Sequence, residues 1–220
     1  MDNSALSLTE PLEYFDISPL VSESIGVFPG DQPYRRHVIM DFKKGDNLVL
    51  SNLHTTVHLG AHVDAPSHYH PQGKGIDTRR LDYYLGGAQV VSVILPRGQR
   101  ILPKHIAQVR ISAKRVLFKT GSFPDPNRWN DDFNSLSAEL IDDLAAKGVI
   151  LVGIDTPSVD PCADESLETH HAVFRHDMAN LEGIVLSDVP DGIYTLVALP
   201  LKLKDADATP VRAILIKQKL

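Results

Sequence analysis

A helical segment that leads directly into a buried strand limits the fold of this chain more than any other feature. Residues 137–147 (SAELIDDLAAK) begin with a serine suited to capping a helix, and Gly148 follows their last residue. Residues 149–154 (VILVGI) are apolar throughout and have the composition of a strand that is buried on both faces. A helix followed at once by such a strand predicts a parallel crossover in an α/β sheet.

The residues after this strand occupy the edge of the sheet where open α/β folds bind their ligands. Asp155, Thr156 and Pro157 either line such a site or pack as a tight turn. For Ser158 and Asp160 we expect the packing role, because serine and aspartate are common turn residues.

Further strand patterns predict a large sheet. Short apolar or alternating runs separated by turn residues occupy residues 14–17, 38–42, 48–50, 88–95, 115–120, 184–186, 195–199 and 211–216. The expected turns include Pro190–Gly192 and Thr209–Pro210. No internal repeat or interdomain linker interrupts them, so we predict one mixed, strand-rich α/β domain over residues 14–220, preceded by a mobile leader over residues 1–13.

Composition excludes several classes of function. Of 220 residues, 43% are hydrophobic and 23% are charged, and the net charge is −6 without a long run of one sign. That balance provides no basic surface for nucleic acid or an anionic membrane. The first residues lack the apolar core of a signal peptide, and no apolar run approaches the ~20 residues that span a bilayer. We therefore expect a cytoplasmic protein that acts on or binds a small molecule.

Common nucleophile and nucleotide motifs are absent from the sequence. There is no GxGxxG, P-loop or GxSxG pattern. The single cysteine, Cys162, cannot form an intramolecular disulfide or a cysteine-based zinc site. Its acidic surroundings disfavour the thiolate, so it is a poor candidate for a nucleophile.

The stretch from His54 to His70 (HTTVHLGAHVDAPSHYH) concentrates groups that bind metals or transfer protons. His58, His62 and Asp64 follow one another at intervals that are multiples of two residues, with Gly60 between the histidines. In an extended strand such residues point to one face, and the glycine would leave open space between the side chains. Valines, a glycine and a proline within the stretch disfavour the alternative helix. We therefore predict a strand that runs into a turn and lines a site with its polar face.

Two imidazoles and a carboxylate are suitable ligands for zinc and similar ions, and they leave positions open for water and substrate. His68 lies beyond the predicted strand. It fits three roles: a general acid and base, a third imidazole ligand, or a surface histidine. The spacing of His68 from the other candidate residues does not distinguish these roles. His54 and His70 are weaker candidates, with supporting or surface positions expected for both.

One strand supplies too few ligands for two metal ions, so further ligands are expected from elsewhere in the chain. The later segment offers His170, His171, His176 and Glu182. Adjacent histidines on a helix point in different directions, so at least two of these four residues are expected to be structural or exposed.

The histidine-rich stretch and several later segments resemble a known family. HLGAHVDAPSHY is similar to the H-x-G-[TA]-H-x-D-x-P-x-H signature of the cyclase family of metal-dependent hydrolases. The rest resembles the bacterial kynurenine formamidase (arylformamidase) branch of that family. The resemblance runs from about Asp16 to the C-terminus, and its segments occur in the order of that branch: DISPLV, FPGDQPY, LGGAQVV, VGIDTPSVDP, LETHHAVFRHDMANLEGIVLSDVPDGIYTLVALPLKL and DATPVRAIL.

The resemblance implies a swivelling β/β/α domain, usually dimeric or larger. It implies two metal ions, with Zn²⁺ expected and Mn²⁺ possible. His58, His62 and Asp64 would bind them, with Asp64 bridging, and His170 and Glu182 would complete the ligand set. The resemblance assigns His68 to proton transfer. The implied reaction is hydrolysis of N-formyl-L-kynurenine to L-kynurenine and formate in tryptophan degradation.

This chain departs from the branch at two positions. The branch usually has Trp-Pro-Gly-Asp, with a tryptophan that is thought to line the substrate pocket, where this chain has Phe28 and residues 29–31 (PGD). Phenylalanine keeps an aromatic face but lacks the indole N–H donor. Asp177 stands where glycine is common. The rival hypotheses are a relative that hydrolyses another amide, imide or lactam, as an isatin hydrolase does, and a metal-dependent binding protein without turnover.

Overall fold

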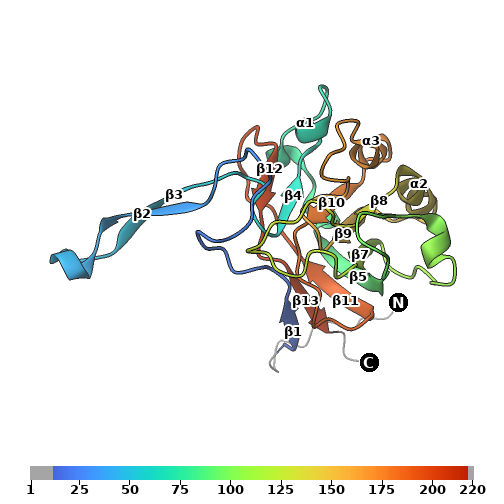
Figure 1. The fold of residues 1–220 in the computed structure, drawn as a ribbon, viewed down its shortest axis with the longest axis horizontal. Helices are drawn as coiled ribbons and strands as arrows, with labels where there is room; N and C mark the ends of the chain where they lie inside the picture. The colour runs from blue at the N-terminus through green and yellow to red at the C-terminus, as the bar shows by residue number, and fades with distance from the viewer. Residues whose placement is uncertain (1–11, 218–220) are drawn as a thin grey trace.

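A curled sheet with a parallel centre and antiparallel edges forms the body of the protein in a computed structural model that describes residues 12–217 (Figure 1). Its strand order is β1-β13-β11-β5-β7-β9-β10-β4-β12, and β5, β7, β9 and β10 run parallel. The strands of this sheet are β1 (Tyr14–Asp16), β4 (His62–Asp64), β5 (Leu85–Ser92), β7 (Arg115–Lys119), β9 (Leu151–Ile154), β10 (Ala179–Glu182), β11 (Gly192–Val197), β12 (Ala208–Pro210) and β13 (Ile214–Lys217).

The predicted parallel crossover is confirmed. Helix α2 (Ala138–Ala146) connects the region after β7 to β9, and β7 and β9 pair in parallel. The Ser137 hydroxyl accepts a hydrogen bond from the Leu140 amide at 3.1 Å, which caps the helix. Gly148 follows with φ of +81°, a conformation that glycine adopts without strain.

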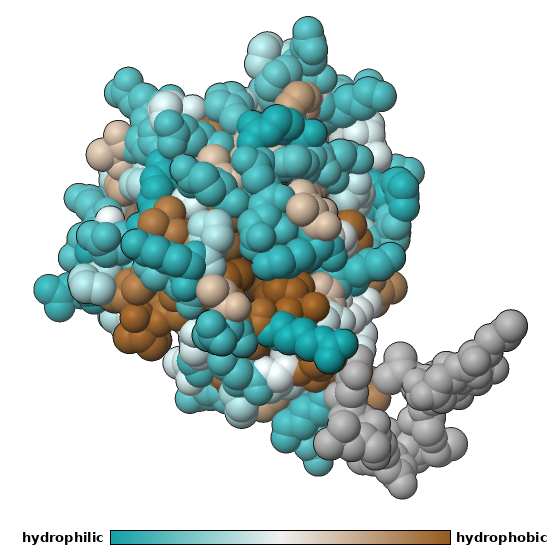
Figure 2. Space-filling view, turned by 90° about the vertical axis from the view of Figure 1, so that its right-hand side faces the viewer, coloured by the Kyte–Doolittle hydropathy of each residue, from teal (hydrophilic) through white to brown (hydrophobic). Residues whose placement is uncertain are grey.

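Helices cover one face of the sheet. Helix α3 (Glu168–Arg175) packs beside α2, and α1 (Pro66–Tyr69) is a single turn near the end of β4. Apolar side chains of α2 and α3, such as Leu144 and Val173, pack with Phe118 and Ile154 of the sheet. The side of the molecule that carries α2 is mostly hydrophilic in its upper part, and hydrophobic side chains gather in its lower part (Figure 2). A second hydrophobic core, on the other face of the sheet, includes Leu117 and Leu181.

Short elements complete the described chain. Four 3-10 turns connect the main elements: η1 (Phe42–Lys44), η2 (Ile76–Thr78), η3 (Leu81–Tyr83) and η4 (Pro103–Ile106). A small parallel pair is formed by β6 (Arg100–Ile101) and β8 (Ser135–Leu136). Strands β2 (Arg35–Met40) and β3 (Leu50–His54) form a hairpin arm that projects away from the body (Figure 1).

The mixed, strand-rich α/β prediction is therefore confirmed, with local corrections. Residues 184–186 are not a strand, because the chain has already paired as β10 and leaves the sheet after Glu182. Thr209 and Pro210 do not form a turn, since they pair with β4 as part of β12. Of the predicted leader, residues 1–11 lie outside the described residues. Within residues 12–217, no helix has the length and hydropathy needed to cross a membrane.

Candidate metal centre and active site

Strand β4 carries two of the predicted ligands into the interior of the protein. It lies between β10 and β12, antiparallel to both, and all three of its residues are buried. Side chains two residues apart on a strand point to the same face, so His62 and Asp64 lie together. Glu182 of β10 is the register partner of His62, which places a second buried carboxylate beside them.

His58 reaches the same place by a route that the periodicity did not predict. The extended segment comprises only His62–Asp64, and residues 55–61 are irregular, so the prediction of one strand face that includes His58 is wrong. Gly60 has φ of +55°, and a Cβ on Gly183 would lie 2.1 Å from the Gly60 carbonyl oxygen. The two glycines allow close backbone contact between the segments that flank β4 and β10. They do not create open space between side chains.

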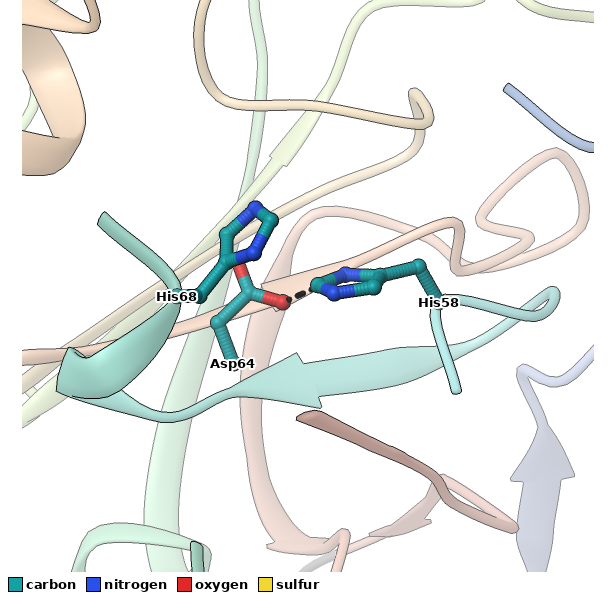
Figure 3. A group of neighbouring side chains, drawn as sticks. All are labelled: His58, Asp64 and His68. Atoms are coloured by element: carbon teal, nitrogen blue, oxygen red, sulfur yellow. Dashed lines mark ion pairs between the residues drawn. The ribbon is translucent and has the colours of Figure 1, made fainter. Parts of the chain in front are cut away.

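Helix α1 supplies His68. Pro66 occupies the first position of this short helix, where its missing N–H costs nothing. Figure 3 shows the imidazole of His68 approaching the Asp64 carboxylate from α1, while His58 approaches it from the loop before β4. The rings of His58 and His68 are 4.1 Å apart between centroids. The ligand atoms of His58, Asp64 and His68 all lie within 4.8 Å of one another.

Of the later histidines, only His170 enters the cluster. Its Nδ1 donates to Asp160 Oδ2 at 2.7 Å, and its backbone N–H donates to the same oxygen at 3.0 Å. The hydrogen bond from Nδ1 fixes which ring nitrogen of His170 carries the proton, and it directs Nε2 toward Asp64 and Glu182. The sequence analysis expected Asp160 to pack in a turn; in the structure it is buried and also holds the His170 imidazole. No motif distinguished Asp160 from the other residues of the turn.

The distances between the imidazole nitrogens and the carboxylate oxygens match those between ligand atoms around a small cation. His62 Nε2 lies 3.6 Å from Asp64 Oδ1 and 3.3 Å from Glu182 Oε2. His170 Nε2 lies 3.4 Å from Asp64 Oδ2 and 3.5 Å from Glu182 Oε1. Ligands bound at 2.0–2.2 Å in a tetrahedron lie roughly 3.3–3.6 Å apart. The two carboxylates thus turn one pair of oxygens toward His62 and the other pair toward His170.

Unpartnered polar atoms support the same interpretation. His170 Nε2 and Asp64 Oδ1 are buried and have no hydrogen-bond partner in the described part of the chain. Buried polar atoms are normally paired, so these two atoms indicate an absent ligand. The nitrogen and oxygen donor set is the one that zinc and manganese accept. The residues present therefore fit a divalent metal centre.

A third side chain orients both carboxylates. The Asn180 Nδ2 group donates to Asp64 Oδ2 at 2.6 Å and to Glu182 Oε1 at 3.0 Å. The Val159 amide also donates to Glu182 Oε1, at 2.8 Å. Neighbours of this kind hold ligating carboxylates in one orientation. The sequence analysis missed Asn180, although its two-residue spacing from Glu182 on a strand would have placed it on the same face.

Electrostatic attraction within the cluster shifts several pKa values. For His170, burial opposes protonation, but the carboxylates of Asp160, Asp64 and Glu182 outweigh it and hold the pKa well above its usual range. Burial also opposes the ionised form of Asp64, but attraction to the neighbouring imidazoles of His170 and His58 holds its pKa well below its usual range. The cluster therefore concentrates charges that a bound cation would replace.

His58 is held from both sides. Its Nδ1 lies 3.1 Å from Asp64 Oδ1, and its Nε2 lies 3.0 Å from Asp207 Oδ2. Burial lowers its pKa, but the Asp64 and Asp207 carboxylates outweigh this and raise the pKa to about 9. Asp207 precedes β12, and the sequence analysis assigned it no role. Only the pairing of β12 with β4 brings it to the site.

His68 differs from the other histidines of the site in its exposure and environment. About a third of its side chain is exposed, and its Nδ1 lies 3.8 Å from Asp207 Oδ2. Burial lowers its pKa, and the nearby Asp64 carboxylate only partly opposes this. A neutral imidazole at the solvent side of the cluster is able to accept a proton.

A cavity of about 320 Å³ opens beside the cluster. Its wall includes His58 and His62, and three aromatic side chains that contact one another edge to face. These are Phe28, Phe123 and Trp129. Phe28 therefore lies in the wall of this cavity, and its contact with a substrate stays a prediction. The sequence analysis assigned Trp129 no role; its ring lies 5.4 Å from the Phe28 ring and adds an indole to the same cavity.

The remaining candidate histidines have other neighbours. His54 is exposed on the hairpin arm, and His70 stacks on Phe174 with ring centroids 3.7 Å apart. His171 is exposed on the outer side of α3, and His176 contacts Asp142 at 2.6 Å. None of the four contributes to the cluster.

Asp177 occupies a left-handed backbone conformation that glycine adopts without strain. Its φ is +47°. Its carboxylate accepts hydrogen bonds from Arg79 at 2.8 Å and from the Tyr83 hydroxyl at 2.7 Å. These contacts offset the strain of a left-handed conformation in a residue other than glycine.

Comparison with known proteins shows the family and the fold of this chain. The model of the family described as "Putative cyclase" matches residues 7–161, so the chain belongs to that family. Solved structures of the same fold include one described as a potential metal-dependent hydrolase with cyclase activity, with a TM-score of 0.83 and 28% identity over 96% of this chain and 100% of that chain. An isatin hydrolase bound to thioisatinate has the same fold, with a TM-score of 0.79 and 17% identity over 94% of this chain and 93% of its own.

Curated relatives are more similar in sequence. The kynurenine formamidase of Bordetella pertussis is 43% identical over 202 residues, which cover 91% of this chain and 96% of that protein. The kynurenine formamidase of Bordetella avium is 41% identical over the same shares of both chains.

Proposed function

We propose that this protein is an arylformamidase that hydrolyses N-formyl-L-kynurenine to L-kynurenine and formate, as part of tryptophan degradation. The observation that carries the proposal is the pair of buried carboxylates, Asp64 and Glu182, that face imidazole nitrogens on both sides beside an aromatic cavity. Relatives named kynurenine formamidase match nearly the whole chain, which supports the choice of substrate.

The metal ligands in this proposal are His58, His62, Asp64, His170 and Glu182. Two ions per subunit, with Zn²⁺ as the first choice and Mn²⁺ as the second, would supply Lewis acidity and an activated water when bound. Asp64 and Glu182 would each offer one oxygen on the side of His62 and the other on the side of His170, so both would serve as ligands shared by the two ions. Asn180 and Asp160 keep these ligands in position.

His68 is the proposed acid and base. Its imidazole lies at the open side of the cluster, beside His58 and Asp64. It takes a proton from the water as the oxygen adds to the formyl carbon. It then gives that proton to the anilide nitrogen as the carbon–nitrogen bond breaks, which leaves kynurenine and formic acid, and the acid ionises to formate. An arylamine is a poor leaving group without that proton, and help of this kind contributes ~10²–10⁴ in rate.

The cavity provides a place for the aromatic part of the substrate. Phe28, Phe123 and Trp129 offer ring faces and edges close to His58 and His62. Aromatic pairs of this kind stabilise contacts beyond simple burial. We propose that Phe28 contacts the aryl ring.

A metal-dependence experiment tests the function. Purified protein loaded with Zn²⁺ is expected to release kynurenine from N-formylkynurenine, chelation is expected to abolish this activity, and Zn²⁺ or Mn²⁺ is expected to restore it. The panel should include isatin and a simple formanilide. Cleavage of isatin alone would favour the lactam hydrolase, and bound metal without turnover of any substrate would favour a binding protein.

We also propose that the protein forms a homodimer or a higher oligomer. The β2–β3 arm projects from the body and exposes Ile39, Phe42 and Leu53. A two-stranded hairpin is marginally stable by itself, and exposed apolar side chains of this kind mark interfaces. The cytoplasmic location expected from the sequence stays a prediction.

Sedimentation equilibrium tests the assembly. Wild-type protein at micromolar concentration is expected to sediment as a dimer or larger. The double variant Phe42→Ser, Leu53→Ser is expected to shift the mass toward the monomer, while the nearby exposed change Lys44→Ser leaves it unchanged. A monomeric wild-type mass over the whole concentration range would overturn this assignment.

A further inference from the structure

Two side chains of opposite charge, neither of them among the proposed metal ligands, line the cavity. Lys119 ends β7, and Asp155 directly follows β9. The last register pair of these parallel strands is Phe118 with Ile154, so Lys119 and Asp155 follow one residue later. Neighbouring strands lie about 4.8 Å apart, and side chains alternate between the two faces along each strand. The side chains of Lys119 and Asp155 therefore point to the same face and are neighbours.

These neighbouring charges do not neutralise each other. Among the described residues, no ion pair joins Lys119 to Asp155 or joins either of them to another charged group. The Lys119 ammonium donates to the carbonyl oxygens of Val189 at 2.8 Å and of Ser187 at 3.4 Å. An ammonium has three N–H donors, so one remains for a ligand.

The Asp155 carboxylate is held by neutral groups. It accepts hydrogen bonds from the backbone amides of Thr120 and Gly121 at 2.9 Å and from the Thr120 hydroxyl at 2.6 Å. Its exposed fraction is 8%. Burial raises its pKa, and these hydrogen bonds only partly oppose the shift. A nearly buried carboxylate without a cationic partner is costly unless a ligand supplies the opposite charge.

The rest of the cavity wall is mainly apolar and aromatic, with Phe28, Trp129 and Ile184 among its members. The cavity therefore combines three kinds of wall: metal-ligand histidines, aromatic side chains, and one cation beside one anion. A ligand that matches all three carries a hydrolysable amide, an aryl ring, and an ammonium next to a carboxylate.

We propose that Lys119 and Asp155 form a specificity site for the α-carboxylate and the α-ammonium of an aryl amino acid substrate. Lys119 binds the carboxylate and Asp155 binds the ammonium. This assignment rests on the proposed formamidase function and adds to it, because it requires the substrate to be a zwitterion and not merely a formylated arylamine. Both residues are binding residues, distant in sequence from the metal-ligand motif.

Two formamides with the same reacting group test the assignment. N-formylkynurenine carries the amino acid, and the N-formyl derivative of 2-aminoacetophenone has the same aryl ketone without it. Lys119→Met is expected to raise KM for N-formylkynurenine roughly 10- to 100-fold, the effect of losing a hydrogen bond to a charged group, with a smaller change in kcat. The ratio of kcat/KM between the two substrates is expected to fall by a similar factor.

Lys119→Arg keeps the charge and is expected to keep most of the preference, which shows that loss of folding is not responsible. Lys104→Met, an exposed lysine on η4, is the matched control and is expected to leave the ratio unchanged. An equal loss on both substrates in Lys119→Met, or no loss on either, overturns the specificity site while leaving the formamidase function in place. Wild-type, metal-loaded protein that cleaves neither formamide overturns both.

Discussion

Replacing Asp64 with asparagine is expected to remove bound metal and activity together. Asp64 is 1% exposed, and its two oxygens face His58 and His62 on one side and His170 on the other. An amide offers one neutral oxygen in place of two charged ones, so it cannot serve both sides. The loss of several kcal/mol of charge stabilisation predicts a fall in kcat/KM of about a thousandfold or more.

To check this result, metal content is measured by mass spectrometry, and the rate of N-formylkynurenine cleavage is measured in the same samples. Glu182→Gln is expected to behave like the Asp64 variant, because Glu182 faces both imidazoles as well. Glu165→Gln changes an exposed carboxylate in the loop before α3 and serves as the control. An Asp64→Asn protein that keeps two ions per subunit and near wild-type activity would rule out the bridging role.

Replacing His68 with glutamine is expected to lower kcat about 10²- to 10⁴-fold while the bound metal remains. His68 lies on α1 at the open side of the cluster, with its side chain about a third exposed and its Nδ1 3.8 Å from Asp207 Oδ2. It is therefore placed to move a proton between water and the leaving nitrogen. Glutamine keeps the polarity and approximate size of the side chain but does not titrate.

Metal content separates the two chemical roles that the sequence left open for His68. Loss of an ion in His68→Gln would make it a ligand, whereas full occupancy with slow turnover supports proton transfer. His70→Gln is the matched control, because His70 ends the same helix but stacks on Phe174 outside the site. The control is expected to keep both its metal and its rate.

Local patterns predicted the elements that position the site. The serine cap and the terminal glycine of residues 137–148, followed by an apolar strand, correctly predicted α2 and a parallel crossover, which the structure forms between β7 and β9. These signals act within a few residues, so the sequence displays them directly. Patterns failed where a segment's structure depends on a distant partner, as for β10 and for β12, which pair on either side of β4.

The cluster of candidate metal ligands was predicted for a partly wrong reason. His58, His62 and Asp64 do converge, but only His62 and Asp64 share a strand face. His58 arrives through a loop whose Gly60 lies against Gly183. Two-residue spacing detects a cluster of metal-binding side chains, but it does not reveal which of them the backbone holds in an extended conformation.

The sequence by itself determined the type of fold, the chemistry of the donor set and the segment that carries it, because these depend on side-chain identity and on local periodicity. Spacing alone did not distinguish His170 from His171 and His176. The family resemblance implied His170, and the tertiary structure shows that it faces Asp64 and Glu182, since neighbouring residues on a helix point in different directions and packing decides which of them faces the core. Only the tertiary structure brought Asp160, Asn180 and Asp207 to the site and placed Lys119 beside Asp155. These contacts join segments far apart in the chain, and only the pairing of strands and the packing of helices on the sheet bring such segments together.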